Sequence, residues 1–141
     1  MRILAVDPGE KRIGIALSDP TGTIANPLTT INHISRPIDS ATIAQLAAEN
    51  GAKLIVIGQS LDDENRPTPQ GRRAARLAAA IQRQTKLAVA LWDESGSTAA
   101  ARMARIEMNT SQRKRRGHLD DLAATYILQT YLDAQVHRYP E

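Results

Sequence analysis

The chain has 141 residues, a net charge of +3 and 42% hydrophobic residues, a size that fits one domain over residues 1–141 with a proper core. It lacks cysteine and carries only one Trp and three Tyr, which excludes disulfides and thiolate metal sites and disfavours aromatic base-stacking platforms. The longest apolar runs fall far short of the roughly 20 residues that span a bilayer, so we expect a cytoplasmic protein with no membrane partner.

The N-terminal third predicts three antiparallel strands. Residues 2–6 and 12–18 are apolar and alternating, and a Pro-Gly turn at 8–11 joins them as a hairpin. A second turn at 19–22 leads to a weaker strand near 23–30.

Strands and helices then alternate along the chain. Continuous apolar runs at 53–58 and 87–92 predict two strands that are buried on both faces. Apolar stripes, with Ile38 and Ala75 facing inward, predict helices at 35–50, 71–84, 98–108 and 118–135. The order βββ-α-β-α-β-α-α predicts an α/β protein with a mixed five-stranded sheet, in which an antiparallel meander joins parallel strands, flanked by helices on both faces.

Three acidic residues occupy positions from which they could meet. Asp7 ends the first strand, Glu94 follows the last strand, and Asp120 starts the final helix on its apolar side. If the first and last strands are parallel neighbours, Asp7 and Glu94 emerge at the same edge of the sheet. Converging carboxylates repel one another unless a divalent cation holds them, and Mg²⁺ or Mn²⁺ suits oxygen ligands and phosphate-bearing substrates.

Each acid also has a simpler explanation. Asp7 stands in an Asp-Pro-Gly sequence that is typical of a turn. Glu94 precedes a possible helix start at 97–98, and Asp120 lies in the first turn of its own helix. The helix dipole stabilises a negative charge at both positions. The residues themselves leave both explanations open.

Basic residues lie close to these acids in the sequence. Lys11 and Arg12 flank the first turn, and Arg72, with Arg73 and Arg76, starts the second helix. These groups could contact phosphates, although a solvated helix face explains the three helix arginines slightly better. Four adjacent cations precede the final helix and favour contact with nucleic acid: Arg113, Lys114, Arg115 and Arg116.

Four segments resemble those of a known family: LAVDPGEKRIGIALSD at 4–19, LIVIGQSLDDENRPTPQGRRA at 54–74, LWDESGST at 91–98 and KRRGHLDDLAATYILQTYLD at 114–133. The family is YqgF, or RuvX, whose members are RNase H-like proteins described as Holliday junction resolvases and as nucleases that process the precursor of small-subunit ribosomal RNA. The resemblance implies an RNase H-like fold with Asp7, Glu94 and Asp120 as metal-binding catalytic acids. Ser95 departs from the pattern, because the family commonly has arginine there.

The resemblance implies a metal-dependent endonuclease that acts in 5′-end processing of pre-16S rRNA during ribosome biogenesis. Its partners would be structured RNA and ribosomal precursor particles, and the protein would be a monomer or a homodimer. Three alternatives stay open: a resolvase of branched, four-way DNA junctions, a binding module that recognises nucleic acid without cutting it, and an actin-like ATPase. The ATPase needs two lobes, and 141 residues supply one.

Overall fold

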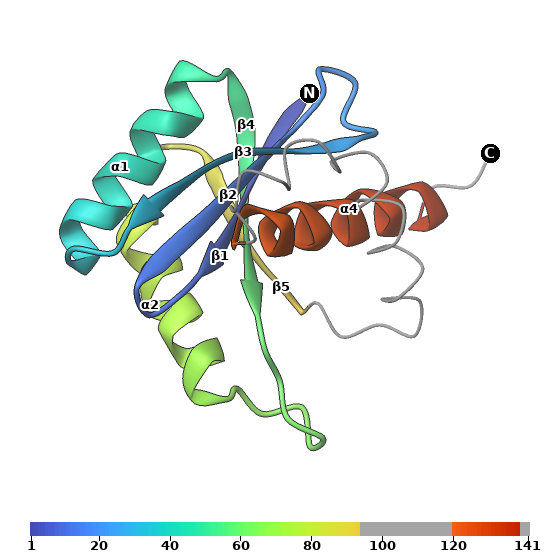
Figure 1. Ribbon diagram of the computed structural model, residues 1–141. Coiled ribbons are helices and arrows are strands. Elements are labelled where there is room, and N and C mark those ends of the chain that lie inside the picture. The colour runs from blue at the N-terminus through green and yellow to red at the C-terminus, as the bar shows by residue number, and fades with distance from the viewer. Residues whose placement is uncertain (94–119, 139–141) are drawn as a thin grey trace.

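The computed structural model describes residues 1–93 and 120–138, which form a five-stranded sheet and three helices (Figure 1). The elements are β1 (Arg2–Pro8), β2 (Arg12–Ser18), β3 (Ala25–Asn32), α1 (Arg36–Glu49), β4 (Ala52–Gln59), α2 (Pro69–Gln82), β5 (Ala88–Asp93) and α4 (Asp120–Arg138). The helix expected over 98–108 lies outside the described residues. No helix within the described ranges is long and apolar enough to cross a membrane.

The sheet has the strand order β3-β2-β1-β4-β5. Strand β1 pairs antiparallel with β2 and parallel with β4, while β2 pairs antiparallel with β3 and β4 pairs parallel with β5. The predicted mixed sheet, a meander joined to parallel strands, is therefore confirmed. Because β1, β4 and β5 run in the same direction, their carboxyl ends lie at one edge of the sheet.

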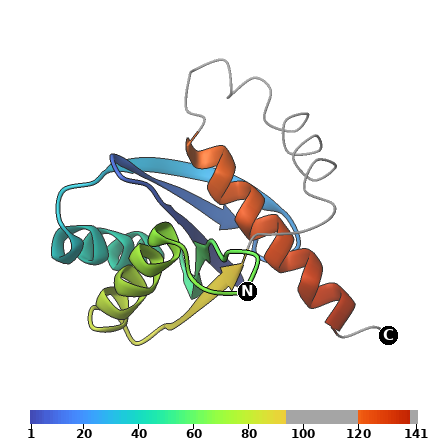
Figure 2. The ribbon, with the colours of Figure 1, turned by 90° about the horizontal axis from the view of Figure 1, so that it is seen from below.

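The helices cover both faces of the sheet, as Figure 2 shows. Side chains alternate along β1, so that Leu4 and Val6 pack towards α1 and α2 in one core while Ile3 and Ala5 pack towards α4 in the other. The centre of the sheet is completely enclosed, since Ile55, Val56 and Ile57 of β4 have no exposed surface. The prediction of a strand buried on both faces is correct for β4.

The same prediction is wrong for β5, which is the outermost strand on one side of the described sheet. Ala88 is exposed and Leu91 keeps 38% of its surface exposed. An apolar run indicates that a strand is hydrophobic, but the position of that strand in the sheet depends on which partners it pairs with. Within the described residues, β5 pairs only with β4.

Two predicted inward positions on the helices are also wrong. Ile38 of α1 is 49% exposed, and Asp39 is buried in its place because its carboxylate accepts a hydrogen bond from the Ile34 N–H and pairs with His33 Nδ1. In α2, Ala75 is exposed and Ala74 faces inward. The buried positions 74, 77, 78 and 81 follow the i, i+3, i+4, i+7 spacing of one helix face.

Candidate active site

Asp7 lies at the carboxyl end of the central strand and faces α4. Its neighbour Val6 packs towards α1 and α2, so strand alternation turns the half-buried Asp7 to the opposite face. Asp7 pairs with Gly14 of β2, and the Val6–Ile57 pairing places Gly58 on its other side. Two glycines therefore flank this carboxylate in the sheet.

Helix α4 packs against the sheet directly beside Asp7. A Cβ atom added at Gly58 would lie 2.3 Å from Ile127 Cδ1, so glycine is required for the close approach of helix and strand. Ile127 is fully buried, so its side chain cannot turn towards solvent. The sequence motif around Gly58 gave no sign of this role, because the contact depends on pairing between distant segments.

Hydrogen bonds connect α4 to the outermost strands of the sheet, β5 on one side and β3 on the other. Trp92 of β5 donates from Nε1 to Thr130 Oγ1 at 2.9 Å, and its ring meets Tyr131 edge-on with centroids 5.3 Å apart. On the other side, Gln129 accepts from the Ala25 N–H at 3.0 Å. These contacts fix the orientation of α4 across the face that Asp7 occupies.

The three predicted acids are described to different extents. Asp120 is the first residue of α4, about 10 Å along the helix axis from Ile127, and nothing is described of its side chain. Glu94 lies outside the described residues, directly after the end of β5 at Asp93. The condition that the first and last strands are neighbours is not met, since β4 lies between β1 and β5. Strands two spacings apart are separated by about 10 Å.

The predicted phosphate contacts are described only in part. Lys11 in the β1–β2 connection and Arg12, the first residue of β2, are exposed, and the His33 N–H donates a 2.8 Å hydrogen bond to the Lys11 carbonyl. Arg72 donates from Nη1 to the Pro67 carbonyl at 3.1 Å and so is held by the loop before α2. The basic run at 113–116 lies outside the described residues.

Asp19, in the connection between β2 and β3, has a perturbed carboxyl group. Its carboxylate accepts hydrogen bonds from the Ile24 N–H, from the hydroxyl and N–H of Thr21 and from the Thr23 N–H. These bonds, the one from Ile24 above all, hold the pKa of Asp19 well below its usual range. Asp19 stabilises a turn at the edge opposite Asp7, so its role is structural.

Among residues 1–93 and 120–138, no group of three carboxylate or imidazole side chains gathers closely enough to hold a metal ion. Asp7 is among these residues, and Glu94 is not. The assignment of Asp7, Glu94 and Asp120 to a common metal site therefore stays a prediction.

The chain matches one protein family over most of its length. The model of the RuvX family, described as Holliday junction resolvase, matches residues 1–134. A protein of Clostridium beijerinckii with the name "Putative pre-16S rRNA nuclease" is 41% identical over 94% of this chain and 96% of its own length. Relatives with the same name in Thermoanaerobacter pseudethanolicus and Myxococcus xanthus are 37% and 36% identical, over 98% and 100% of this chain and 100% and 92% of their own lengths.

Solved structures agree with the topology. Thermus thermophilus RuvC in complex with a Holliday junction substrate superposes with a TM-score of 0.68 at 11% identity, over 96% of both chains. The fowlpox virus resolvase in complex with Holliday junction DNA gives a TM-score of 0.61 at 13% identity, over 96% of this chain and 99% of its own. At such low identity these structures speak for the fold, and they confirm the expected RNase H-like architecture.

Proposed function

Because the chain belongs to the RuvX family of Holliday junction resolvases, we propose that it is a metal-dependent endonuclease that processes the 5′ end of pre-16S rRNA during ribosome biogenesis. Nuclease activity follows from the family and from relatives that are named nucleases. The alignment with this chain covers 96% and 100% of the length of two of them. Its substrate is accordingly a nucleic acid. We further propose that the substrate is RNA, that the activity depends on a divalent metal and that the three acids hold it. Association with ribosomal precursor particles and a cytoplasmic location are also part of the proposal.

The position of Asp7 carries the proposal. It stands on the central strand, at the edge where three parallel strands end, and this edge is where open α/β sheets bind their ligands. It faces the helix that begins at Asp120. Gly14 beside it brings no side chain to that face, so a ligand has no competitor at this position in β2.

The chemistry of the three acids fits a divalent metal site. Asp7 is a half-buried carboxylate near the end of β1, and Glu94 follows β5 in the sequence. Carboxylate oxygens are the ligands that Mg²⁺ prefers, and a nucleic-acid substrate supplies phosphate oxygens as further ligands. We assign Asp7, Glu94 and Asp120 as the residues that would hold Mg²⁺ or Mn²⁺.

When bound, such ions activate a water molecule and neutralise the charge on the leaving oxygen of a phosphodiester. The chain itself supplies the fixed positions of the ligands. Strand β1 carries Asp7 in the centre of the sheet, and the Trp92–Thr130 hydrogen bond ties β5 to α4. Lys11 and Arg12, exposed next to this edge, are placed to contact flanking phosphates.

A second candidate substrate is the four-way DNA junction, which the description of the family names. Symmetric cutting of a junction requires two active sites and hence a dimer. The names of the relatives at 37% and 41% identity favour the ribosomal RNA precursor. Ser95, where the family commonly has arginine, lies directly after Glu94 and is a further reason to measure cleavage and binding separately.

The test is cleavage of a 5′-extended pre-16S rRNA fragment and of a four-way DNA junction, each with Mg²⁺, with Mn²⁺ and with a chelator. We expect metal-dependent products from the RNA, and Asp7→Asn should lower the cleavage rate by a factor of at least 100 while the protein still binds. Asp63→Asn removes a carboxylate from the exposed loop before α2 and is the matched control. Cleavage by Asp7→Asn at the rate of this control would refute the assignment.

A further inference from the structure

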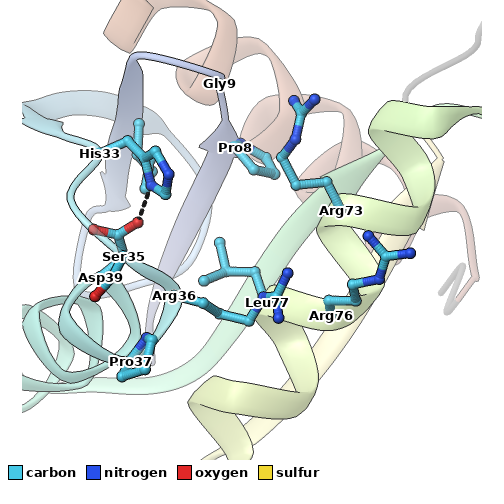
Figure 3. Close-up of a pocket in the computed structure, with 11 residues that line it drawn as sticks. Pro8, Gly9, His33, Ser35, Arg36, Pro37, Asp39, Arg73, Arg76 and Leu77 are labelled. Atoms are coloured by element: carbon cyan, nitrogen blue, oxygen red, sulfur yellow. Dashed lines mark hydrogen bonds and ion pairs between the residues drawn. The ribbon is translucent and has the colours of Figure 1, made fainter.

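A cavity of about 440 Å³ opens on the face of the sheet opposite α4, next to the end of β1 (Figure 3). Its volume lies within the range of about 300–1,000 Å³ that small-ligand sites occupy. The floor includes Ile13 and Leu77 of the core, and the rim is polar. It is separate from the surface around Asp7, which lies on the α4 side.

Three arginines from two helices line this cavity. Figure 3 shows Arg73 and Arg76 of α2 on one side and His33 and Asp39 on the other, with Arg36 of α1 between them. The arginines of α2, which the sequence could not distinguish from a solvated helix face, therefore share a hollow with an arginine of another helix. Guanidinium groups gathered around one space are typical of phosphate recognition.

The charges in and around the cavity leave a surplus of positive charge. Arg73 Nη2 lies 3.3 Å from Glu10 Oε1, and Asp39 is only 3% exposed and paired with His33. Within residues 1–93 and 120–138, neither Arg36 nor Arg76 forms an ion pair. Both are exposed, so an anion from solution can reach them.

The cavity begins one residue after Asp7. Strand alternation turns Pro8 to the side opposite Asp7, and both Pro8 and Gly9 line the cavity. The Cα atoms of Asp7 and Gly9 are at most about 7 Å apart, because they are two residues apart in the chain. A flexible chain of phosphates that passes over the β1–β2 connection can thus touch both faces of the sheet.

We propose that this cavity binds a phosphate group of the nucleic-acid strand whose cleavage site lies at Asp7, through Arg36 and Arg76. The proposal rests on the proposed nuclease function and adds a second contact to the same substrate. It makes the β1–β2 connection the point around which the strand bends. Phosphate chemistry would also suit a free nucleotide, and the experiment separates the two sources.

The test measures binding of a fluorescein-labelled RNA hairpin with a single-stranded 5′ extension, in the Asp7→Asn background, over a range of salt concentrations. The double variant Arg36→Gln with Arg76→Gln should bind at least about tenfold more weakly, as expected for the loss of charge-assisted hydrogen bonds. The slope of log K against log salt should fall by about 0.7–0.9, because the cavity contributes one phosphate contact.

The matched control is the double variant Arg83→Gln with Lys86→Gln, which removes two exposed charges beyond the far end of α2. Its affinity should stay within twofold of the parent protein. An equal loss in both double variants, or an unchanged affinity and slope after the loss of Arg36 and Arg76, would overturn the proposal. The melting temperature of each variant checks that the fold is intact.

A 5′-mononucleotide and inorganic phosphate serve as competitors of the labelled RNA. The competing outcome is that mononucleotide affinity falls when Arg36 and Arg76 are replaced while RNA affinity stays unchanged. The cavity is then a nucleotide site, and the proposed contact with the RNA strand is wrong. Failure of the nuclease assignment is seen elsewhere, as absence of metal-dependent cleavage by the unmodified protein. Weakened binding by the arginine variants would support the phosphate contact even then.

Discussion

Substitution of Gly58 by alanine tests how closely α4 packs beside Asp7. The new Cβ would lie 2.3 Å from Ile127 Cδ1 and 3.0 Å from Ile127 Cγ1. Because Ile127 is fully buried, its side chain cannot move aside into solvent. Overpacking of this kind costs about 1–3 kcal/mol, which for a chain of this length lowers the melting temperature by about 3–10 °C.

A double-mutant cycle with Ile127→Val isolates the contact. Valine lacks the Cδ1 atom, and on its own it should cost about 0.5–1.5 kcal/mol. In the Ile127→Val background, Gly58→Ala should cost at least about 1 kcal/mol less than in the parent protein, as measured by urea unfolding. Purely additive effects would show that the clash is relieved elsewhere and that α4 does not depend on glycine at this position.

Three other predictions concern separate contacts. Trp92→Phe removes the hydrogen bond to Thr130 and should destabilise the protein by about 1–2 kcal/mol in urea unfolding, whereas Thr85→Val, which removes a hydroxyl contact before β5, should cost less. Asp19→Ala should flatten the pH dependence of stability below about pH 4. The native carboxyl of Asp19 has a lowered pKa, so it stabilises the fold above its unfolded-state pKa of about 3.8, and this stabilisation is lost as the pH falls. Neutralising residues 113–116 to glutamine should lower the salt slope of RNA binding by up to about 3, with little change in melting temperature.

The sequence predicted the strands well because local alternation and turn residues specify them. The hairpin of β1 and β2 needs only the Pro-Gly connection, where a Cβ at Gly9 would lie 2.1 Å from the Arg12 carbonyl oxygen. Pairing between distant strands is another matter. The apolar runs of β4 and β5 look alike in the sequence. Because β1 pairs with β4, however, β4 is enclosed between two strands and β5 is the outermost strand of the described sheet.

The candidate site shows the same limit. The position of Asp7 at a strand end can be read from its own neighbours, and the sequence placed it correctly there. Its surroundings could not be read, because Gly14 and Gly58 reach it through pairing with two different strands and Ile127 covers Gly58 from a helix almost 70 residues later. Arg73 and Arg76 were ambiguous for the same reason, since the cavity that they line includes residues of α1.

The order of the strands also decides what surrounds Asp7. Because β4 pairs with β1, the position beside Asp7 on that side is Gly58, which carries no side chain. Ile127 of α4 occupies the space over Gly58. An apolar side chain therefore borders Asp7 on the β4 side, whereas Gly14 brings no side chain to the β2 side. A group that binds Asp7 would accordingly meet less steric hindrance over β2 than over β4.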